Sequence, residues 1–193
     1  MAPWVIALIV VAVVLVVVIA LVVWWVKIYN QLVELRERVK NGWAQIDVQL
    51  KKRYDLIPNL VETVKGYAKH EHDTLTEVTA ARSRATSATT QEDIMAANGE
   101  LSNALSRLLV SVERYPELKA NENFIRLQAD LRDIEDKIAF ARQFYNDVAQ
   151  KNNELISKFP SSLVANANKT KFKIAEYFEI ENAAVREAPK IQF

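Results

Sequence analysis

The sequence predicts an all-α protein in which an N-terminal transmembrane helix continues into an elongated antiparallel bundle of about four helices. Three observations lead to this class. The first 26 residues carry no charged side chain, apolar residues then recur at helical spacing, and only three glycines occur among 193 residues. So few glycines disfavour the tight turns of β-hairpins, and the abundance of Ala, Leu, Glu, Gln, Lys and Arg favours helix.

Residues 4–26 are an uninterrupted run of 23 apolar residues. At about 1.5 Å per residue they make a helix of roughly 34 Å, which is long enough to cross the ~30 Å hydrocarbon core of a bilayer. Trp4 at one end and Trp24 and Trp25 at the other match the aromatic belts of the two interfaces, and Lys27 follows directly. A cleaved signal peptide fits poorly, because no basic region precedes the run and no small-residue cleavage site follows it.

The charges beside this anchor predict its orientation. Lys27, Arg36, Arg38 and Lys40 follow the apolar run, and no basic residue precedes it. The positive-inside rule then places residues 1–3 on the extracytoplasmic side as a short N-terminus, and the helical domain in the cytoplasm. We therefore expect a single-pass protein of the cytoplasmic membrane.

Residues 27–159 are predicted to form the cytoplasmic helical bundle. In its first helix, about residues 27–69, apolar positions keep an average spacing of 3.6 residues, and their phase does not change across Pro58. We expect one long helix that bends near Tyr54, because an interior proline removes a backbone hydrogen bond and clashes with the carbonyl four residues earlier. The positions of this stripe are Leu32, Leu35, Val39, Trp43, Ile46, Leu50, Tyr54, Ile57, Val61, Val64 and Ala68.

Two shorter helices and a second long one are expected to complete the bundle. The shorter ones cover about residues 74–87 and 91–114, the latter capped by Thr90 with Asp93 three residues on. The last, about residues 117–158, carries a heptad seam that predicts coiled-coil-like packing. The seam consists of Phe124, Leu127, Leu131, Ile134, Ile138, Ala141, Tyr145, Val148, Asn152 and Leu155.

The polar member of the seam and the C-terminal segment leave alternatives open. Asn152 could fix the register of the helices, or it could lie near an open end of the bundle, which is the interpretation we favour. Residues 160–193 lack clean periodicity and predict a short helix with an extended tail. The tail aromatics Phe172, Tyr177 and Phe178 are expected to cover the end of the bundle rather than to contact lipid.

The composition argues against several kinds of chemistry. There is no cysteine, so thiol chemistry and zinc–thiolate sites are excluded. His70 and His72 are two residues apart, a spacing that does not place two metal ligands on one helix face, and no HExxH motif is present. The 25 basic and 24 acidic residues give no basic excess for nucleic acid. We expect no enzyme activity, no catalytic residue, and no cofactor or metal site.

The basic run Lys51, Lys52 and Arg53 is the candidate partner-binding site. On a straight helix Arg53 would lie about 40 Å beyond residue 26, several Debye lengths from the headgroups, so the membrane is not its expected partner. Asp47 and Asp55 lie within one helical turn of the run. An ordinary solvated helix face is therefore the favoured interpretation, and a docking face for another protein is the alternative.

Two long stretches resemble the LemA family of bacterial membrane proteins. They are YNQLVELRERVKNGWAQIDVQLKKRYDLIPNLVETVKGYAKHEHDTL and YPELKANENFIRLQADLRDIEDKIAFARQFYNDVAQKNNELISKFPSSLVA, and the ending KFKIAEYFE with the terminal PKIQF also fits. The resemblance covers about residues 28–193. One departure is Gly42, where the family motif usually has alanine before the tryptophan, and it is expected to loosen the helix slightly.

The resemblance implies one N-terminal transmembrane helix, a short extracellular N-terminus and a cytoplasmic α-helical domain, and it supplies no mechanism. The function we expect is a non-enzymatic, membrane-anchored scaffold or assembly protein that self-associates or binds a protein partner, with the bilayer contacted through residues 4–26. The alternative is an adaptor that docks a signalling or stress-response partner through the helix face around Lys51–Arg53.

Overall fold

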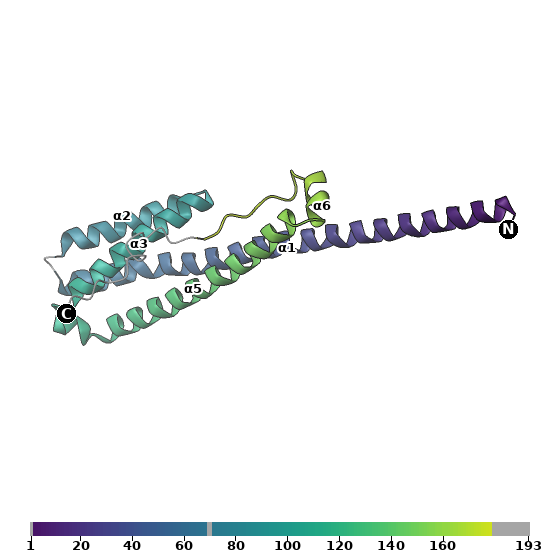
Figure 1. Cartoon of the computed structure of the whole chain (residues 1–193). Coiled ribbons are helices and arrows are strands. Elements are labelled where there is room, and N and C mark those ends of the chain that lie inside the picture. The colour runs from purple at the N-terminus through teal and green to yellow at the C-terminus, as the bar shows by residue number, and fades with distance from the viewer. Residues whose placement is uncertain (1, 69–70, 179–193) are drawn as a thin grey trace, which may run out of the picture. The chain divides into compact units, whose positions relative to one another are not determined.

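The computed structural model describes residues 2–68 and 71–178, and within these ranges it contains six α-helices and no strand. The all-α class is confirmed, with a long apolar N-terminal helix that packs against later helices (Figure 1). The helices are α1 (Pro3–Tyr67), α2 (His72–Ser87), α3 (Gln91–Val112), α4 (Pro116–Lys119), α5 (Glu122–Ser157) and α6 (Ser161–Ala167).

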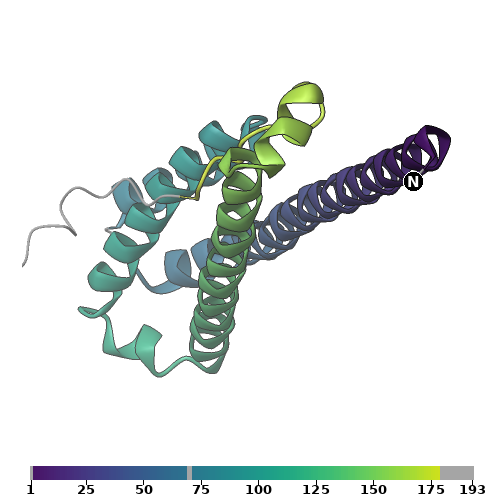
Figure 2. The same ribbon diagram turned by 45° about the vertical axis from the view of Figure 1, so that its right-hand side comes forward.

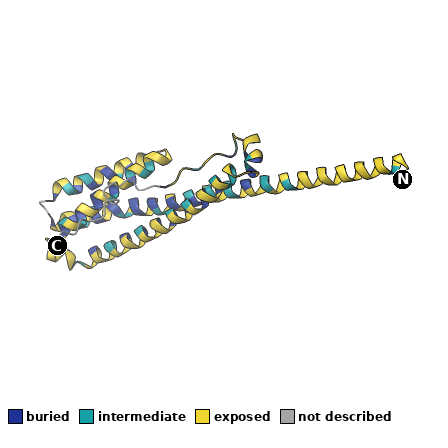
Figure 3. Cartoon of the chain, viewed as in Figure 1, coloured by how far each residue is buried: buried dark blue, intermediate teal, exposed yellow. Residues whose placement is uncertain are grey.

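Helix α1 joins the predicted anchor and the first bundle helix into one element of 65 residues that continues through Pro58. Its beginning is exposed on all sides, whereas its later turns show buried positions at helical spacing (Figure 3). Every position of the predicted stripe is buried or half-buried. The unchanged phase of the apolar positions across Pro58 therefore predicted a continuous helix correctly. The bend near Tyr54 stays a prediction.

The prediction of a single helix over residues 117–158 is wrong in one respect, because the chain forms two helices there, α4 and α5. The chain leaves helical geometry after Lys119, and α5 begins at Glu122. The Asn121 side chain caps the new helix, since its Oδ1 accepts a hydrogen bond from the Phe124 backbone N–H at 3.0 Å. An asparagine in this position satisfies an N–H that the first turn of a helix leaves without a partner.

The chain divides into two compact units, which are described separately. The first unit consists of the residues up to Trp43 and Gln143–Tyr177, and the second consists of Ala44–Arg142 together with Phe178. The first unit therefore holds the beginning of α1, the end of α5 and helix α6. The second unit holds the end of α1, helices α2 to α4, and the beginning of α5.

In the first unit, α6 packs against the part of α1 that follows the apolar run. Four buried residues form the centre of this core: Leu32 of α1, Val164 and Ala165 of α6, and Phe172. The Phe172 ring meets the Tyr29 ring edge-on, with centroids 5.6 Å apart. Partly buried side chains surround this centre, namely Trp24, Ile28, Tyr29, Val33, Leu155 and Ile156.

Further along the first unit, α1 approaches α5 closely at Gly42. A Cβ at this position would lie 3.3 Å from the Tyr145 Cα, so only a residue without a side chain fits at this backbone separation without adjustment. Trp43 adds an edge-on contact with the Tyr145 ring at 5.6 Å between centroids. Gly42 therefore serves close helix packing, which differs from the loosening that the sequence suggested.

The segment after α6 runs along α5. Side chains of α5 hold this segment through hydrogen bonds to the segment's backbone. Asn153 donates from Nδ2 to the Ala175 carbonyl and accepts from the Ala175 N–H, both at 2.8 Å. Asn152 donates to the Lys173 carbonyl at 3.2 Å, and the Tyr145 hydroxyl donates to the Glu176 carbonyl at 2.8 Å. Asn152 is 3% exposed, so the favoured placement at an open end is wrong: the C-terminal segment covers it.

The second unit is a helical bundle with its own apolar core. Leu50 and Ile57 of α1, Val78 of α2, Leu108 of α3 and Ile138 of α5 are all almost fully buried. Helices α2 and α3 lie side by side in both ribbon views (Figure 2).

The predicted cap at the start of α3 is confirmed. The Thr90 hydroxyl oxygen accepts a hydrogen bond from the Asp93 N–H at 3.1 Å, and the hydroxyl donates to the Asp93 carboxylate at 2.6 Å. This reciprocal pair fixes the point at which the chain re-enters helix after α2.

Candidate functional site

The residues predicted to anchor the chain lie along α1, whose N-terminal part is strongly apolar and is not buried by the rest of the described chain. Within the described residues, α1 is the one helix long and apolar enough to cross a membrane. Trp4 is 65% exposed, Trp25 is exposed, and Lys27 is exposed, whereas Trp24 is half-buried against the core of the first unit. This apolar surface suggests a membrane anchor, because no part of the described chain covers it.

The structure separates the three residues of the basic run. Lys51 and Lys52 are exposed on α1, whereas Arg53 is fully buried. The interpretation of the run as one solvated face is therefore wrong for Arg53. The signal was present in the sequence: position 53 lies three residues after Leu50 and four before Ile57, which is the spacing of the buried stripe itself.

Inside the second unit Arg53 joins three helices. Its Nε lies 2.9 Å from the Glu135 carboxylate of α5, and its Nη2 donates to the Ser102 hydroxyl of α3 at 2.8 Å. Nη1 is buried without a hydrogen-bond partner among the described residues. Burial lowers the pKa of the Arg53 guanidinium, and the Glu135 carboxylate opposes that shift. Because an arginine guanidinium stays protonated in proteins, a charged group lies in the core.

Next to Arg53, the carbonyl that Pro58 leaves without its helical partner is satisfied by another helix. A residue with an N–H at position 58 would donate to the Tyr54 carbonyl, and proline cannot. Arg82 of α2 donates to this carbonyl from Nε at 2.8 Å. The Tyr54 hydroxyl accepts from Nδ2 of the buried Asn98 of α3 at 2.6 Å. The proline of α1 is thereby built into the packing of α1 against α2 and α3.

A second arginine lies close to this polar group. Arg142 of α5 places its guanidinium carbon 4.3 Å from the centre of the Phe178 ring. Burial lowers the pKa of Arg142, and the nearby positive charge of Arg53 lowers it further, while Glu135 opposes both effects. Burial also raises the pKa of the Tyr54 hydroxyl, so this group is a neutral phenol at neutral pH. The interior thus holds more positive than negative charge around Glu135.

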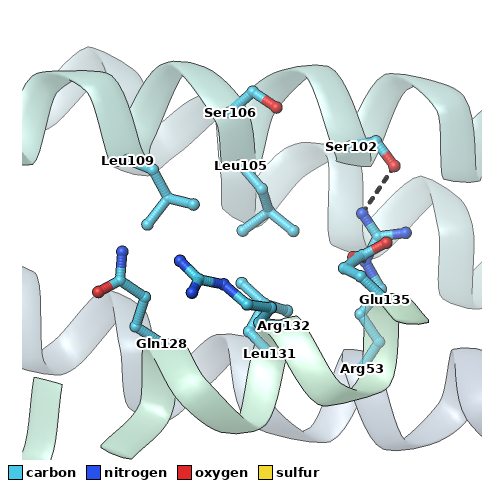
Figure 4. A pocket seen from close by; sticks show the side chains of 9 residues that line it. All are labelled: Arg53, Ser102, Leu105, Ser106, Leu109, Gln128, Leu131, Arg132 and Glu135. Atoms are coloured by element: carbon cyan, nitrogen blue, oxygen red, sulfur yellow. Dashed lines mark hydrogen bonds and ion pairs between the residues drawn. The ribbon is translucent and has the colours of Figure 1, made fainter. Parts of the chain in front are cut away.

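A cavity of about 300 Å³ opens beside Arg53. Figure 4 shows the Arg132 guanidinium extending between Gln128 and Leu109. With Arg53, Arg132 and Glu135 in its wall, the cavity carries one more positive than negative charge, so it favours an anionic group or water over a cation. Its full lining is Arg53, Ser102, Leu105, Ser106, Leu109, Gln128, Leu131, Arg132 and Glu135.

His72 does not line this cavity. His72 is the first residue of α2, with its side chain 87% exposed and its Nδ1 3.8 Å from the Asp73 carboxylate. His70 lies outside the described residues. Over residues 2–68 and 71–178, His, Cys, Asp and Glu form no group of three that could hold a metal ion.

The fold and these sites define a class of protein: an α-helical protein with one N-terminal helix suited to membrane anchoring. Within that class, residues 42–193 match the LemA family. The chain belongs to the LemA family. The match begins at Gly42, so it includes the polar interior around Arg53 and Pro58 and leaves out residues 4–26.

Several proteins are similar to this chain. The magnetosome proteins MamQ 1 and MamQ 2 of Paramagnetospirillum magneticum are each 28% identical over 177 residues, covering 78% of this chain and 64% of theirs. Protein LemA of Metamycoplasma hominis is 22% identical over 164 residues, covering 84% of this chain and 70% of its own length. The matched region therefore spans somewhat less than two thirds of each MamQ protein.

Proposed function

We propose that this LemA-family protein is a non-enzymatic, membrane-anchored helical scaffold that self-associates or organises protein partners at the cytoplasmic face of the membrane. The observation that carries the proposal is that α1 is one continuous helix with two different surfaces. Its N-terminal part is apolar and exposed on all sides, and its C-terminal part buries one apolar face in the bundle. Such a helix would tie a protein-binding domain to the bilayer through a semi-rigid helical connection rather than a flexible linker.

Exposed apolar side chains of the second unit support the assembly part of the proposal. Phe140 of α5 and Val110 of α3 are each 72% exposed. Aromatic residues are enriched at protein–protein interfaces, and burial of a phenylalanine ring removes a large apolar area from water. Phe140 is the residue on which we expect self-association to depend.

Chemical cross-linking and mass measurement of the full-length protein in mild detergent test this proposal. We expect oligomers or a co-purifying partner, and we expect Phe140→Ser to reduce them several-fold while helicity is unchanged. Arg126→Ser, a change at an exposed residue of the same helix, is the matched control. If only monomer is found and no partner co-purifies, the scaffold proposal is wrong.

A second proposal is an adaptor that docks a partner through the outer face of α1. Val48, Lys51 and Lys52 are all exposed and lie within about one turn of each other, so the face combines an apolar residue with two charges. Arg53 does not contribute, because it is buried. Charge reversal at Lys51 and Lys52 should abolish a pulled-down interaction, and an unchanged set of bound proteins would contradict the adaptor.

A further inference from the structure

We propose that the turn between α5 and α6 is a second membrane contact, in which Phe159 and Leu163 enter the headgroup region and the surrounding lysines bind anionic lipid. This inference rests on the proposed membrane anchoring of residues 4–26. It adds to that proposal a lipid-binding surface more than 130 residues further along the chain. The surface consists of Lys158, Phe159, Leu163, Lys169 and Lys173.

The packing of the first unit places α6 at the depth where the anchor leaves the bilayer. Trp24, at the end of the apolar run, is partly buried against the core formed by α6 and Phe172. Figure 1 shows α6 beside α1 at the point from which the uncovered N-terminal part of α1 extends. Tryptophan at the end of a membrane span marks the interface between hydrocarbon and headgroups. A helix packed against Trp24 therefore lies at that interface.

Two large apolar side chains are exposed on α6 and the turn before it. Phe159 is 81% exposed and Leu163 is 52% exposed, whereas Val164 and Ala165 are buried against α1. Phe159 and Leu163 are four residues apart, and both lie at the junction of α5 and α6. A single exposed apolar residue is ordinary on a protein surface. Two together, at the level of an interfacial tryptophan, match the pattern of a segment that lies in the membrane surface.

The charged residues between Glu154 and Glu176 are all lysines. From Leu155 to Ala175 the chain contains four lysines and no acidic residue. Lys158 pairs with Glu154 at 2.7 Å, and Lys171 donates to the Tyr29 hydroxyl at 2.5 Å. Lys169 and Lys173 are exposed. Basic residues next to a membrane-spanning helix are attracted to anionic headgroups, so this cluster complements the cytoplasmic leaflet.

The absence of cysteine from the chain allows a direct test by single-cysteine labelling. Phe159→Cys and Leu163→Cys each receive an environment-sensitive fluorophore, and the full-length protein is reconstituted into phosphatidylcholine vesicles with and without phosphatidylglycerol. Lipids that carry a quencher near the headgroup report contact. Phe144→Cys is the matched control, since this residue of the same unit is 38% exposed and lies roughly 22 Å back along α5.

We expect quenching at positions 159 and 163 to be several-fold stronger than at 144, and stronger still when phosphatidylglycerol is present. Lys169→Gln with Lys173→Gln should remove that additional quenching. The reverse result, with 159 and 163 no more quenched than 144, overturns the inference. A label shielded from both lipid quencher and aqueous iodide also overturns it, because a protein would then cover the turn.

A label at Val16→Cys separates failure of this inference from failure of the anchor. Val16 lies within the apolar run and is 66% exposed in the chain. Deep quenching at 16 without quenching at 159 and 163 leaves the anchor standing and removes the second contact. If 16 is not quenched by lipid, both the anchor and this inference are wrong.

Discussion

The two ends of helix α1 differ in what surrounds them. Val16 and Val48 lie on the same helix, and both are more than half exposed within the chain. Around Val16 every neighbouring turn is apolar, whereas around Val48 an apolar stripe alternates with charged residues. The difference suggests that the two ends of one continuous helix face different surroundings: an all-round apolar surface suits lipid, and a striped surface suits water on one side and protein on the other.

The cores of the two units also differ in polarity. The centre of the first unit beside the anchor, formed by Leu32, Val164, Ala165 and Phe172, is apolar. The second unit encloses a charged arginine among its leucines. A buried ion pair rarely adds stability over apolar residues of the same size, but it penalises packings that leave the charge without its partner. We infer that Arg53 and Pro58 make the packing of the second unit specific rather than strong.

The largest expected effect sharpens this view of the second unit. Glu135→Ala leaves the buried Arg53 without its carboxylate. Because the Glu135 side chain is itself 40% exposed, which weakens the pairing, we expect the free energy of unfolding to fall by about 2 kcal/mol. Asp133→Ala, which removes an exposed pair with Lys137 on the same helix, should change it by less than about 0.5 kcal/mol. Chemical denaturation of the detergent-solubilised chain, followed by circular dichroism, measures both.

A second variant tests whether the buried charge of Arg53 causes the loss of stability in Glu135→Ala. Arg53→Met replaces the guanidinium by an apolar side chain, so in its presence Glu135→Ala should have much less effect. Equal losses for Glu135→Ala and Asp133→Ala would contradict the account of Arg53 as a buried charge.

The next effect concerns Pro58. Arg82→Ala removes the donor to the Tyr54 carbonyl, and an unsatisfied carbonyl in this position should lower the free energy of unfolding by about 1.5 kcal/mol. In a Pro58→Ala background the restored N–H at position 58 satisfies the carbonyl, so the same change should fall to about 0.5 kcal/mol. A double-mutant cycle measures this coupling. An Arg82 effect independent of residue 58 would show that Arg82 does not compensate for the proline.

A smaller, local effect is expected in the first unit. Asn153→Ala removes both hydrogen bonds to Ala175. Hydrogen exchange of the Ala175 amide should accelerate about tenfold, while the exchange rates of the α5 amides stay unchanged. Asn166→Ala, at an exposed position of α6, is the control and should leave that amide unaffected. Unchanged exchange in Asn153→Ala would mean that the segment is held by other contacts.

The smallest effect is a change in titration. Hydrogen bonds from Lys158 and Gln150 lower the pKa of Glu154, so its contribution to stability is present above the pKa of the unfolded chain and is lost as the pH falls through the lowered folded value. Lys158→Ala should raise the pKa of Glu154, and Lys151→Ala should not. Carboxyl chemical shifts recorded by NMR against pH measure both, and an unmoved titration in Lys158→Ala would contradict the assignment.

The helices could be predicted because periodicity records which face of each is buried. The stripe from Leu32 to Ala68 and the seam from Phe124 to Leu155 both correspond to buried or half-buried positions. The division at Ala120 and Asn121 could not be predicted from the seam, since the break falls just before its first member. It depends on the Asn121 cap, a local bond that leaves the apolar spacing unchanged.

The polar interior was harder to predict for a different reason. Charge type suggested that Arg53 belongs to the surface, while its position between Leu50 and Ile57 places it on the buried face. The position of Arg53 in the helix outweighed its charge, because two distant residues pair with the guanidinium. They are Glu135 and Ser102, which lie 82 and 49 residues further along the chain. Arg82 and Tyr54 depend in the same way on contacts between distant segments, which local sequence patterns do not record.

The most direct test of the central comparison uses the two exposed valines of α1. Val16→Cys and Val48→Cys, each labelled in the full-length protein in vesicles, are exposed to a lipid-borne quencher and to aqueous iodide. We predict that the label at 16 is quenched by lipid and shielded from iodide, and that the label at 48 is quenched by iodide and not by lipid. Access of iodide to both positions would contradict the claim that α1 passes from lipid into a water-facing bundle.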